Sequence, residues 1–317
     1  MQPYDVLNLG LVVVDIPIKL PVDTLDFSLD TIRIEDMQMI PGGDAANSSI
    51  ALRQLGKNVS LTAAVGDDTF GDYLLAEFAR LGIDTSHIST KPGVITGVAL
   101  VLVNNAGERT CVCTRGNNRE LSVADFDRSL FASGARHINV SSLFGHPKLE
   151  QGGLAGLLAQ AREAGLVTSA DVGHDRNRRG FPWVKEIIGQ LDYFFPSYEQ
   201  AVLLTGERDP KRQAAFIASH TGERTVIIKM GGEGCFVHEP SGKEYMIPAF
   251  KADAVDTTGA GDTFVAAMIS ALLDGMDIAQ SARYANAAAA INVGHIGSVS
   301  PDITPQNIQK LLGQSSL

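Results

Sequence analysis

Three stretches of the chain share one pattern of apolar and polar residues. In residues 51–66, 76–88 and 159–173, apolar side chains recur at a helical spacing, a glycine follows, and a β-branched run comes next. A glycine in this place is typical of a helix C-terminus, where the backbone turns left-handed. These glycines are Gly56, Gly82 and Gly165. The repeated order of helix, glycine and strand predicts α/β units around a mainly parallel sheet.

The second half of the chain continues this order. Residues 192–197 and 225–231 are typical of buried strands, and the helical stretch between them stops at Gly206. The last third is mostly helical, with residues 263–276 apolar on every side. A chain of 317 residues can form one large α/β unit, and no low-complexity linker divides it. We therefore expect a single domain over residues 1–317, with the apolar N-terminal run as a buried first strand.

Two segments depart from the α/β order. Residues 97–114 alternate as two strands around Asn104–Gly107, a sequence that favours a hairpin turn. Residues 16–40 are also expected to be extended. Both segments are too short for a core of their own. We expect them to form a small β-sheet lid, at about residues 16–40 and 97–114, that projects from the body.

Composition and charge limit the kinds of ligand. The net charge of −10 argues against a nucleic-acid backbone or an anionic membrane as the main partner. No run reaches the ~18 apolar residues of a membrane span. The N-terminal run carries Asp5 and Asp15 and lacks a basic region, so we expect no signal peptide. Cys111, Cys113 and Cys235 cannot all pair, which favours reduced thiols in the cytoplasm. Small molecules are the expected ligands.

Residues 255–264, VDTTGAGDTF, place small residues and an acid directly before a buried helix. A helix N-terminus has unpaired N–H groups and a partial positive charge, so it favours an anion. Gly259, Ala260 and Gly261 would let a ligand approach this backbone closely. Asp262, in the first turn, can accept a proton from a hydroxyl, which suits phosphoryl transfer to an alcohol. The alternative is an ordinary helix with a capping acid.

A second glycine-rich helix start favours the functional reading. Residues 41–56, PGGDAANSSIALRQLG, contain Gly43 and then Asp44 and Asn47 at the start of a helix. Two polar side chains near a bare backbone suit recognition of several hydroxyls. Two such helix starts in one acidic protein favour a site for two substrates. The GxxxxGK[ST] and GxGxxG nucleotide motifs and the protein-kinase signatures are absent from the sequence.

These two motifs resemble the signatures of the ribokinase (PfkB) family of carbohydrate kinases. Residues 255–264 are similar to its C-terminal signature, and residues 41–56 with 64–74 are similar to its N-terminal signature. The resemblance extends over about residues 5–312, and within the family the chain is most similar to uncharacterised bacterial ribokinase-like sugar kinases. It implies a three-layer α/β/α body with a β-lid, ATP as phosphoryl donor, and Mg²⁺.

The resemblance also implies roles for single residues. It assigns Asp262 as the base that takes the proton of the sugar hydroxyl. It assigns Gly259, Ala260 and Gly261 as the anion hole for the transferred phosphoryl group. It assigns sugar contacts to Asp15, Gly43 and Asn47. It assigns nucleotide contacts to Lys229, Gly231 and Gly234, with Asn286 on the adenine side. It implies a monovalent cation, K⁺, held by Asp256 and Thr258 and by carbonyls near Val293, Ile296 and Ser298.

Two positions depart from the family pattern. The usual Asn-x-x-Glu motif, which organises Mg²⁺ and phosphates, is here Ser197-Tyr198-Glu199-Gln200. Ser197 then falls at the nucleotide phosphates, and either Glu199 takes over the metal or phosphates and water hold it. Ribokinases have Lys at the position of Asp44, so a phosphate of an already phosphorylated sugar would meet a negative charge there.

Two basic segments bear on the substrate. Arg115, after the hairpin, is either a solvated arginine or a contact to the substrate, and family kinases of sugar acids place an Arg nearby. A sugar that carries a carboxylate therefore remains an alternative substrate. Residues 174–183, HDRNRRGFPW, carry four basic residues and are expected to form mostly a solvated loop.

The leading hypothesis is an ATP-dependent kinase that phosphorylates a non-phosphorylated sugar or sugar acid. The alternatives are a nucleoside kinase, which would need aromatic residues near the lid, and a sugar-binding regulator without catalysis. Both faces of the 97–103 strand carry apolar residues. One face can close over the sugar, and the other needs a partner. The resemblance implies that this partner is the lid of a second subunit, so we expect a homodimer.

Overall fold

The computed structural model describes residues 3–105, 109–114, 116–222 and 224–314. Its strands are β1 (Val6–Leu9), β2 (Val13–Lys19), β3 (Ile40–Gly42), β4 (Val59–Gly66), β5 (Ile88–Lys91), β6 (Val98–Val103), β7 (Arg109–Cys113), β8 (His137–Leu143), β9 (Val167–Val172), β10 (Tyr193–Phe195), β11 (Thr225–Lys229), β12 (Cys235–His238) and β13 (Glu244–Ile247).

The α-helices are α1 (Asp44–Gln54), α2 (Thr69–Arg80), α3 (Pro147–Gln151), α4 (Leu154–Glu163), α5 (Phe181–Ile188), α6 (Tyr198–Thr205), α7 (Pro210–Thr221), α8 (Ala260–Leu273), α9 (Ile278–Asn292) and α10 (Pro305–Gln314). Short 3-10 helices lie at η1 (Gly116–Arg119), η2 (Val123–Asp125), η3 (Arg128–Ala132) and η4 (Gly231–Glu233).

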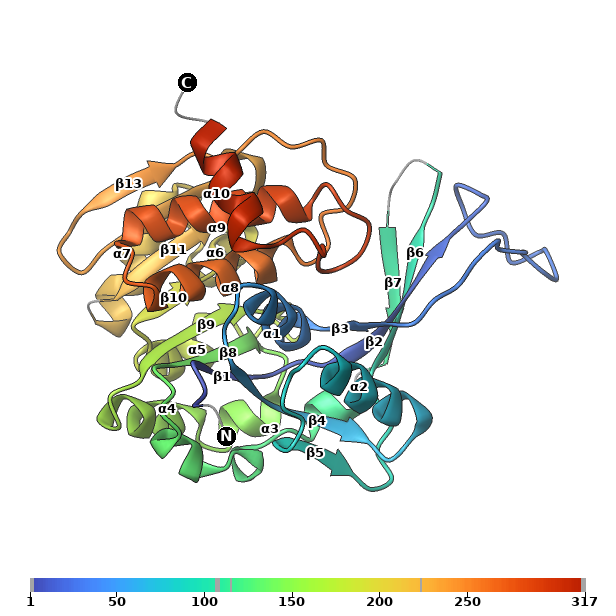
Figure 1. Ribbon diagram of the computed structural model, residues 1–317, viewed down its shortest axis with the longest axis horizontal. Coiled ribbons are helices and arrows are strands. Elements are labelled where there is room, and N and C mark those ends of the chain that lie inside the picture. The colour runs from blue at the N-terminus through green and yellow to red at the C-terminus, as the bar shows by residue number, and fades with distance from the viewer. Residues whose placement is uncertain (1–2, 106–108, 115, 223, 315–317) are drawn as a thin grey trace.

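Nine strands form one large sheet in the order β13-β12-β11-β10-β9-β8-β1-β4-β5. The strands from β11 to β5 pair in parallel, and only β12 and β13 at one edge run antiparallel to their neighbours. A separate sheet in the order β3-β2-β6-β7 projects from the body (Figure 1). The predicted class, an α/β body with a mainly parallel sheet and a small β-sheet, is confirmed.

Helices cover both faces of the large sheet, which makes three layers. Alternate side chains of a strand point to opposite faces. In β1, Leu7 packs in the cluster that contains α4, α5 and α7, whereas Val6 packs in the cluster that contains α1, α8 and α9. Because both faces are buried, strands such as β4 are apolar almost throughout. In the described part of the chain, no helix has the length and apolar character of a membrane span.

The predicted helix ends are confirmed. Gly56, Gly82 and Gly165 have φ values of 81°, 73° and 87°, in the left-handed region where glycine has no steric penalty. Each follows a helix, α1, α2 or α4, and precedes a strand of the large sheet. Gly206 ends α6 in the same way, with a φ of 74°.

The N-terminal run was predicted to be one strand, but it forms two. It divides at Gly10, where β1 of the large sheet ends and the chain crosses to β2 of the small sheet. A Cβ on Gly10 would lie 2.7 Å from the carbonyl oxygen of Ser141, so the crossing requires glycine. Residues 20–39, expected to be extended, contain turns and bends and no strand between β2 and β3. The predicted hairpin joins β6 to β7, but part of its turn, residues 106–108, lies outside the described residues.

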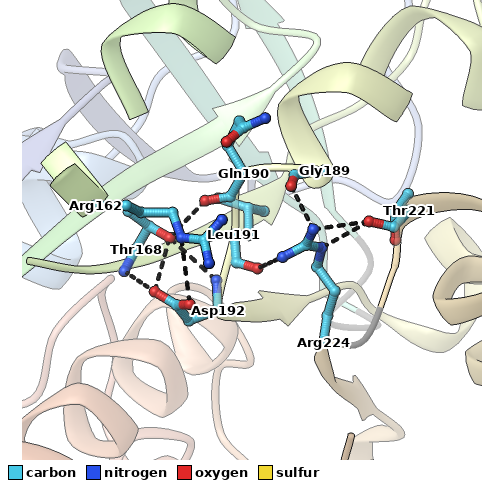
Figure 2. A network of polar contacts seen from close by, with 8 residues as sticks. All are labelled: Arg162, Thr168, Gly189, Gln190, Leu191, Asp192, Thr221 and Arg224. Atoms are coloured by element: carbon cyan, nitrogen blue, oxygen red, sulfur yellow. Dashed lines mark hydrogen bonds and ion pairs between the residues drawn. The ribbon is translucent and has the colours of Figure 1, made fainter. Parts of the chain in front are cut away.

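A polar network fixes the ends of the strands that lie away from the site (Figure 2). The Arg224 guanidinium donates to carbonyls at the ends of two helices, including Thr221 at 2.8 Å, and to Leu191 at 2.6 Å. Asp192 accepts from the N–H of Thr168 at 2.9 Å. Thr168 lies at the beginning of β9, so this network holds the strand ends opposite to the site described next.

Candidate active site

Two cavities meet at the beginning of α8. The large cavity has a volume of about 1120 Å³ and the small cavity a volume of about 410 Å³. Asp44, Gly261 and Asp262 line both of them. The meeting point lies at the carboxyl ends of the parallel strands, the usual place for ligands in an open α/β sheet. A group bound in one cavity can therefore reach a group bound in the other.

The beginning of α8 leaves its backbone accessible. Gly259 precedes the helix with a φ of 68°, and a Cβ there would lie 1.8 Å from the carbonyl oxygen of Ser298. Ala260 and Gly261 line the large cavity. A Cβ on Gly261 would lie 3.3 Å from Lys229 Nζ, so the ammonium group sits beside the helix start. Backbone N–H groups, the helix dipole and this ammonium together favour an anion.

Three carboxylates gather where the cavities meet. Asp44, Asp171 and Asp262 each place an oxygen within 4.8 Å of the others. Asp262 accepts a hydrogen bond from Asn47 Nδ2 at 2.8 Å, and Asp171 accepts one from the N–H of Ser142 at 2.5 Å. Asp44 accepts a hydrogen bond from the Ser142 hydroxyl. The cluster comes from three different elements, α1, β9 and α8.

The environment raises the pKa of two of these acids. Burial, followed by the negative charge of Asp44, raises the pKa values of both Asp262 and Asp171. The hydrogen bond from Asn47 and the charge of Lys229 act in the opposite direction on the pKa of Asp262. A carboxylate with a raised pKa accepts a proton more readily than a free one. Sequence analysis missed Asp171; its one signal was an acid near the carboxyl end of an otherwise buried strand.

The small cavity joins the body to the small sheet. The predicted sugar contacts Asp15, Gly43, Asp44 and Asn47 all line it, together with Ala99 and Thr114 from the small-sheet side. Asp15 lies on β2 of the small sheet rather than on the first strand, and the Ser298 hydroxyl donates to it at 3.3 Å.

Two glycines are required where α1 begins. A Cβ on Gly42 would lie 2.0 Å from Asp15 Oδ2. Gly43 has a φ of 93°, and a Cβ there would lie 2.6 Å from the carbonyl oxygen of Leu11. These close approaches explain the Gly-Gly pair and hold Asp15 beside the helix start. Asn47 is committed to Asp262, so its amide orients the carboxylate at the meeting point.

The segment 174–183 was predicted to be mostly a solvated loop, and His174, Arg176, Asn177 and Arg178 are exposed. His174 and Arg176 also line the small cavity, because the loop after β9 turns beside it. Arg179 stacks on the ring of Trp183, with its guanidinium carbon 3.8 Å from the ring centroid. Spacing alone did not reveal this turn. The other basic candidate, Arg115, lies outside the described residues.

The large cavity brings the predicted nucleotide residues together. Ser197, Lys229, Gly231, Gly234 and Asn286 all line it. Asn286 Nδ2 donates to the carbonyl oxygens of Ile247 at 3.0 Å and Pro248 at 3.2 Å, so this amide fixes the cavity wall after β13.

The altered motif at 197–200 forms a helix cap. The Ser197 hydroxyl accepts from the N–H of Gln200 at 3.2 Å, and Gln200 Oε1 accepts from the N–H of Ser197 at 2.7 Å. Gln200 Nε2 also donates to the carbonyl oxygen of Val172 at 2.6 Å. Glu199 is exposed and lines the large cavity. Carboxylate oxygens suit Mg²⁺, so Glu199 and the three-acid cluster are the fitting donors on this side.

The residues expected to hold a monovalent cation also lie together. Asp256 Oδ1 accepts from the N–H of Thr258 at 2.9 Å, and its Oδ2 accepts from the N–H of Gly297 at 3.0 Å. Asn292 Nδ2 donates to the carbonyls of Thr258 at 2.9 Å and Ser298 at 3.3 Å. The Val293 carbonyl accepts from Asp256 N–H at 3.2 Å. Ile296, next to Gly297, exposes its side chain, so only its backbone can face this loop.

The fold and the paired cavities define a class, the small-molecule kinases with a ribokinase-like body. The family follows from the sequence: residues 7–305 match the pfkB family carbohydrate kinase. The chain belongs to this family. It is thus a carbohydrate kinase by family, a phosphotransferase with an alcohol as acceptor.

Similar proteins agree over nearly the whole chain. The ribokinase of Haemophilus influenzae is 30% identical over 292 residues, which cover 89% of this chain and 90% of that protein. An ATP-dependent ribose-1-phosphate kinase of Halopiger xanaduensis is 30% identical and covers 93% of this chain and 94% of its own length. The crystal structure of a candidate ribokinase II from E. coli with ATP and Mg²⁺ has a TM-score of 0.84, with 22% identity, over 98% of this chain and 99% of that one.

Proposed function

We propose that this protein transfers the γ-phosphoryl group of ATP to a hydroxyl of a sugar or sugar acid, with Asp262 as the base. The observation that carries the proposal is the place of the Asp262 carboxylate, in the first turn of α8 where the two cavities meet. ATP occupies the large cavity and the sugar occupies the small cavity. The reacting hydroxyl and the γ-phosphate then face each other across Asp262.

In the reaction, Asp262 takes the proton of the sugar hydroxyl as the oxygen attacks the γ-phosphorus. The new O–P bond forms while the bond from the γ-phosphorus to the bridging oxygen of ADP breaks, and ADP leaves with that oxygen. Backbone N–H groups of Gly259, Ala260 and Gly261 stabilise the charge on the transferred group. Lys229, beside Gly261, adds a positive charge on the phosphate side. Asn47 keeps the Asp262 carboxylate turned toward the hydroxyl.

The proposal includes two cations. When bound, Mg²⁺ would neutralise and orient the phosphates of ATP, and the fitting donors are Glu199 and Asp171, which line the large cavity. K⁺ occupies the loop of Asp256, Thr258 and the carbonyls of Val293, Ile296 and Ser298. The contacts that fold this loop directly before α8 support the idea, since a cation there strengthens the positive end of the helix.

The nucleoside-kinase alternative is less well supported. A nucleoside acceptor needs an aromatic surface on which its base stacks. Among the described residues that line the small cavity there is no Phe, Tyr or Trp. The alternative of a regulator without catalysis leaves the raised pKa of Asp262, caused by burial and neighbouring acids, without a use.

Consumption of ATP with a panel of sugars, sugar acids and nucleosides tests these functions. We expect ADP to appear with at least one sugar or sugar acid and Mg²⁺, and not without an acceptor. Turnover restricted to nucleosides would establish the first alternative. Binding of a sugar without ATP consumption would establish the second.

We also propose that the protein is a cytoplasmic homodimer joined through its small sheet. None of its three cysteines, all within the described residues, forms a disulfide, which suits a reducing compartment. The segment between β2 and β3 exposes large apolar side chains, including Phe27, which is 96% exposed. A second small sheet would cover them.

A further inference from the structure

A third cavity adjoins the small cavity and is not lined by Asp262. Its volume is about 640 Å³, and it shares Cys113 and Arg176 with the small cavity. Its other lining residues are Gly116, Arg119, Phe144, Pro147, Asn177 and Arg179. We call it the arginine cavity. Arg176 lines both cavities, so a sugar in the small cavity lies beside this guanidinium group, and Arg119 lines the space next to it.

The arginine cavity carries positive charge that no acid of its own lining neutralises. Its lining holds three arginines and no acid. Among the described residues, Arg119 and Arg176 form no ion pair, and Arg176 Nη2 donates only to the weak acceptor Cys113 Sγ at 3.6 Å. Of the nearby acids, Glu120 pairs with Lys148, and Asp175 accepts from the N–H of Gly180. Glu150 accepts from Trp183 and from a backbone N–H, and among the arginines it is Arg179 that its charge affects. Arg119 and Arg176 therefore keep donors for a ligand.

The combined site is electrically polar along its length. Asp44, Asp171 and Asp262 lie at the end where the large cavity begins, and the arginines lie at the other end. Beside these three carboxylates a further anionic group of the acceptor is disfavoured, in contrast to the transferred phosphoryl group that the N–H groups of α8 and Lys229 hold, and the arginines attract it instead. The negative charge of Asp44 thus disfavours a phosphate or carboxylate only at the reacting end. It does not disfavour such a group in the arginine cavity.

We propose that the acceptor sugar carries an anionic group, a carboxylate or a phosphate, at the end remote from the reacting hydroxyl, and that Arg119 and Arg176 bind it. The planar guanidinium of Arg matches either anion with paired hydrogen bonds. This inference rests on the proposed kinase function and names the substrate class of the same site. The anion also fixes which hydroxyl faces Asp262, because it holds the sugar in one direction.

The test compares matched acceptors: neutral sugars, the corresponding sugar acids, and sugar phosphates whose phosphate is remote from the free hydroxyls. We expect the anionic acceptors of one of the two classes to have the highest kcat/KM. Arg176→Gln and Arg119→Gln should each lower that kcat/KM by ~10- to ~100-fold, the range for a lost hydrogen bond to a charged group. Arg119→Gln, which lies outside the small cavity, should change kcat/KM for neutral sugars little.

Arg178→Gln is the matched control. Arg178 lies in the same loop and is exposed, but it lines neither cavity. The Arg178→Gln substitution removes one positive charge and should leave the preference for anionic acceptors unchanged. Raised salt should increase KM for the anionic acceptor in the wild type and less so in Arg176→Gln, because salt screens the attraction. Equal losses in all three variants would show general charge effects and overturn the inference.

A second measurement separates this inference from the proposed function. The rise in melting temperature that each acceptor produces reports binding without turnover. If neutral sugars are phosphorylated best and the two Arg variants leave kcat/KM unchanged, the inference fails and the kinase function stands. If no acceptor consumes ATP, yet anionic sugars raise the melting temperature of the wild type and not of Arg176→Gln, the kinase function fails and the anion site stands. Absence of both effects overturns the inference as well.

Discussion

Asp262 meets two opposing demands at the scale of a single residue. It has to be ionised to take a proton, yet it lies half-buried beside Asp44 and Asp171, and these surroundings raise its pKa. Asn47 and Lys229 offset part of this effect through a hydrogen bond and a positive charge. A base held in this way is reactive because its ionised form is costly.

Asp262→Asn tests whether the carboxylate acts as the base, because it removes the proton acceptor and keeps the shape of the side chain. The amide keeps the size of the side chain and an oxygen for the Asn47 hydrogen bond, but it cannot take a proton. We expect kcat to fall by at least ~10²-fold, the lower range of general-base catalysis, while ATP still binds. Single-turnover kinetics and nucleotide titration measure the two effects. Asp302→Asn, at an exposed acid outside both cavities, is the control. Near-normal turnover of folded Asp262→Asn would refute the assignment.

The same substitution should stabilise the fold at neutral pH. Because the pKa of Asp262 is higher in the folded than in the unfolded chain, the stability tied to this group is present below the unfolded pKa and lost as pH rises through the folded pKa. Asn cannot ionise, so the variant does not lose this stability as pH rises. We expect a higher melting temperature for Asp262→Asn at pH 7 without Mg²⁺, by a few degrees.

At pH values below the unfolded pKa, where the carboxyl is protonated in both states, the melting temperatures of the two proteins should converge. Thermal denaturation across this pH range measures the difference. A variant less stable than the wild type at pH 7 would show that the carboxylate is favourably solvated in the free protein.

At the scale of elements, the sequence predicted what depends on local chemistry. The helix ends at Gly56, Gly82 and Gly165 follow from one residue and its preferred φ, so they were predictable. The helix starts at α1 and α8 also follow from local motifs. The division of the N-terminal run was not predictable, because β1 pairs with β4 and β8 while β2 pairs with β6. An unbroken apolar run is compatible with either pairing.

Side chains that join the site through loops were also hidden. Asp171 looks like any acid after a strand until the fold places it beside Asp44 and Asp262. Arg176 belongs to a basic segment whose composition suggests solvent, and only the turn after β9 brings it to the small cavity. Contacts between distant segments decide both positions, and no local pattern encodes them.

The loop before α8 should respond to the identity of the cation. If Asp256, Thr258 and the neighbouring carbonyls hold K⁺, its charge stabilises the anion at the helix start. We expect activity in K⁺ to exceed activity in Na⁺ or Li⁺ at fixed ionic strength, on the order of 10-fold, since electrostatic groups at such sites have large effects. Asp256→Asn should reduce the difference among the three salts. Equal wild-type rates in all three salts would contradict the cation site.

At the scale of the whole molecule, the small sheet has two faces with different neighbours. Asp15 of β2 and Ala99 of β6 face the small cavity. On the other side, Val14 and Ile16 are buried in the cluster that also contains Leu74 and Phe78 of α2. The outer face is therefore covered by the body close to the base of the sheet. The apolar groups left without such cover lie farther out, in the segment between β2 and β3.

That segment is the reason to expect a dimer. Five large apolar side chains between β2 and β3 are at least 40% exposed: Leu25, Phe27, Leu29, Met37 and Met39. Apolar groups at this density on one projecting part are costly in water, and a two-fold contact between identical small sheets would bury them in both subunits at once. We expect light scattering to give twice the monomer mass at micromolar concentration.

Phe27→Ser with Leu29→Ser should shift the protein toward the monomer without unfolding it, because both residues lie outside the core clusters. Met246→Ser, at an exposed apolar residue on β13 at the far edge of the large sheet, is the control and should leave the dimer intact. A wild-type monomer, or a dimer that persists in the double variant and whose cross-links avoid the small sheet, would show that this segment is covered in another way.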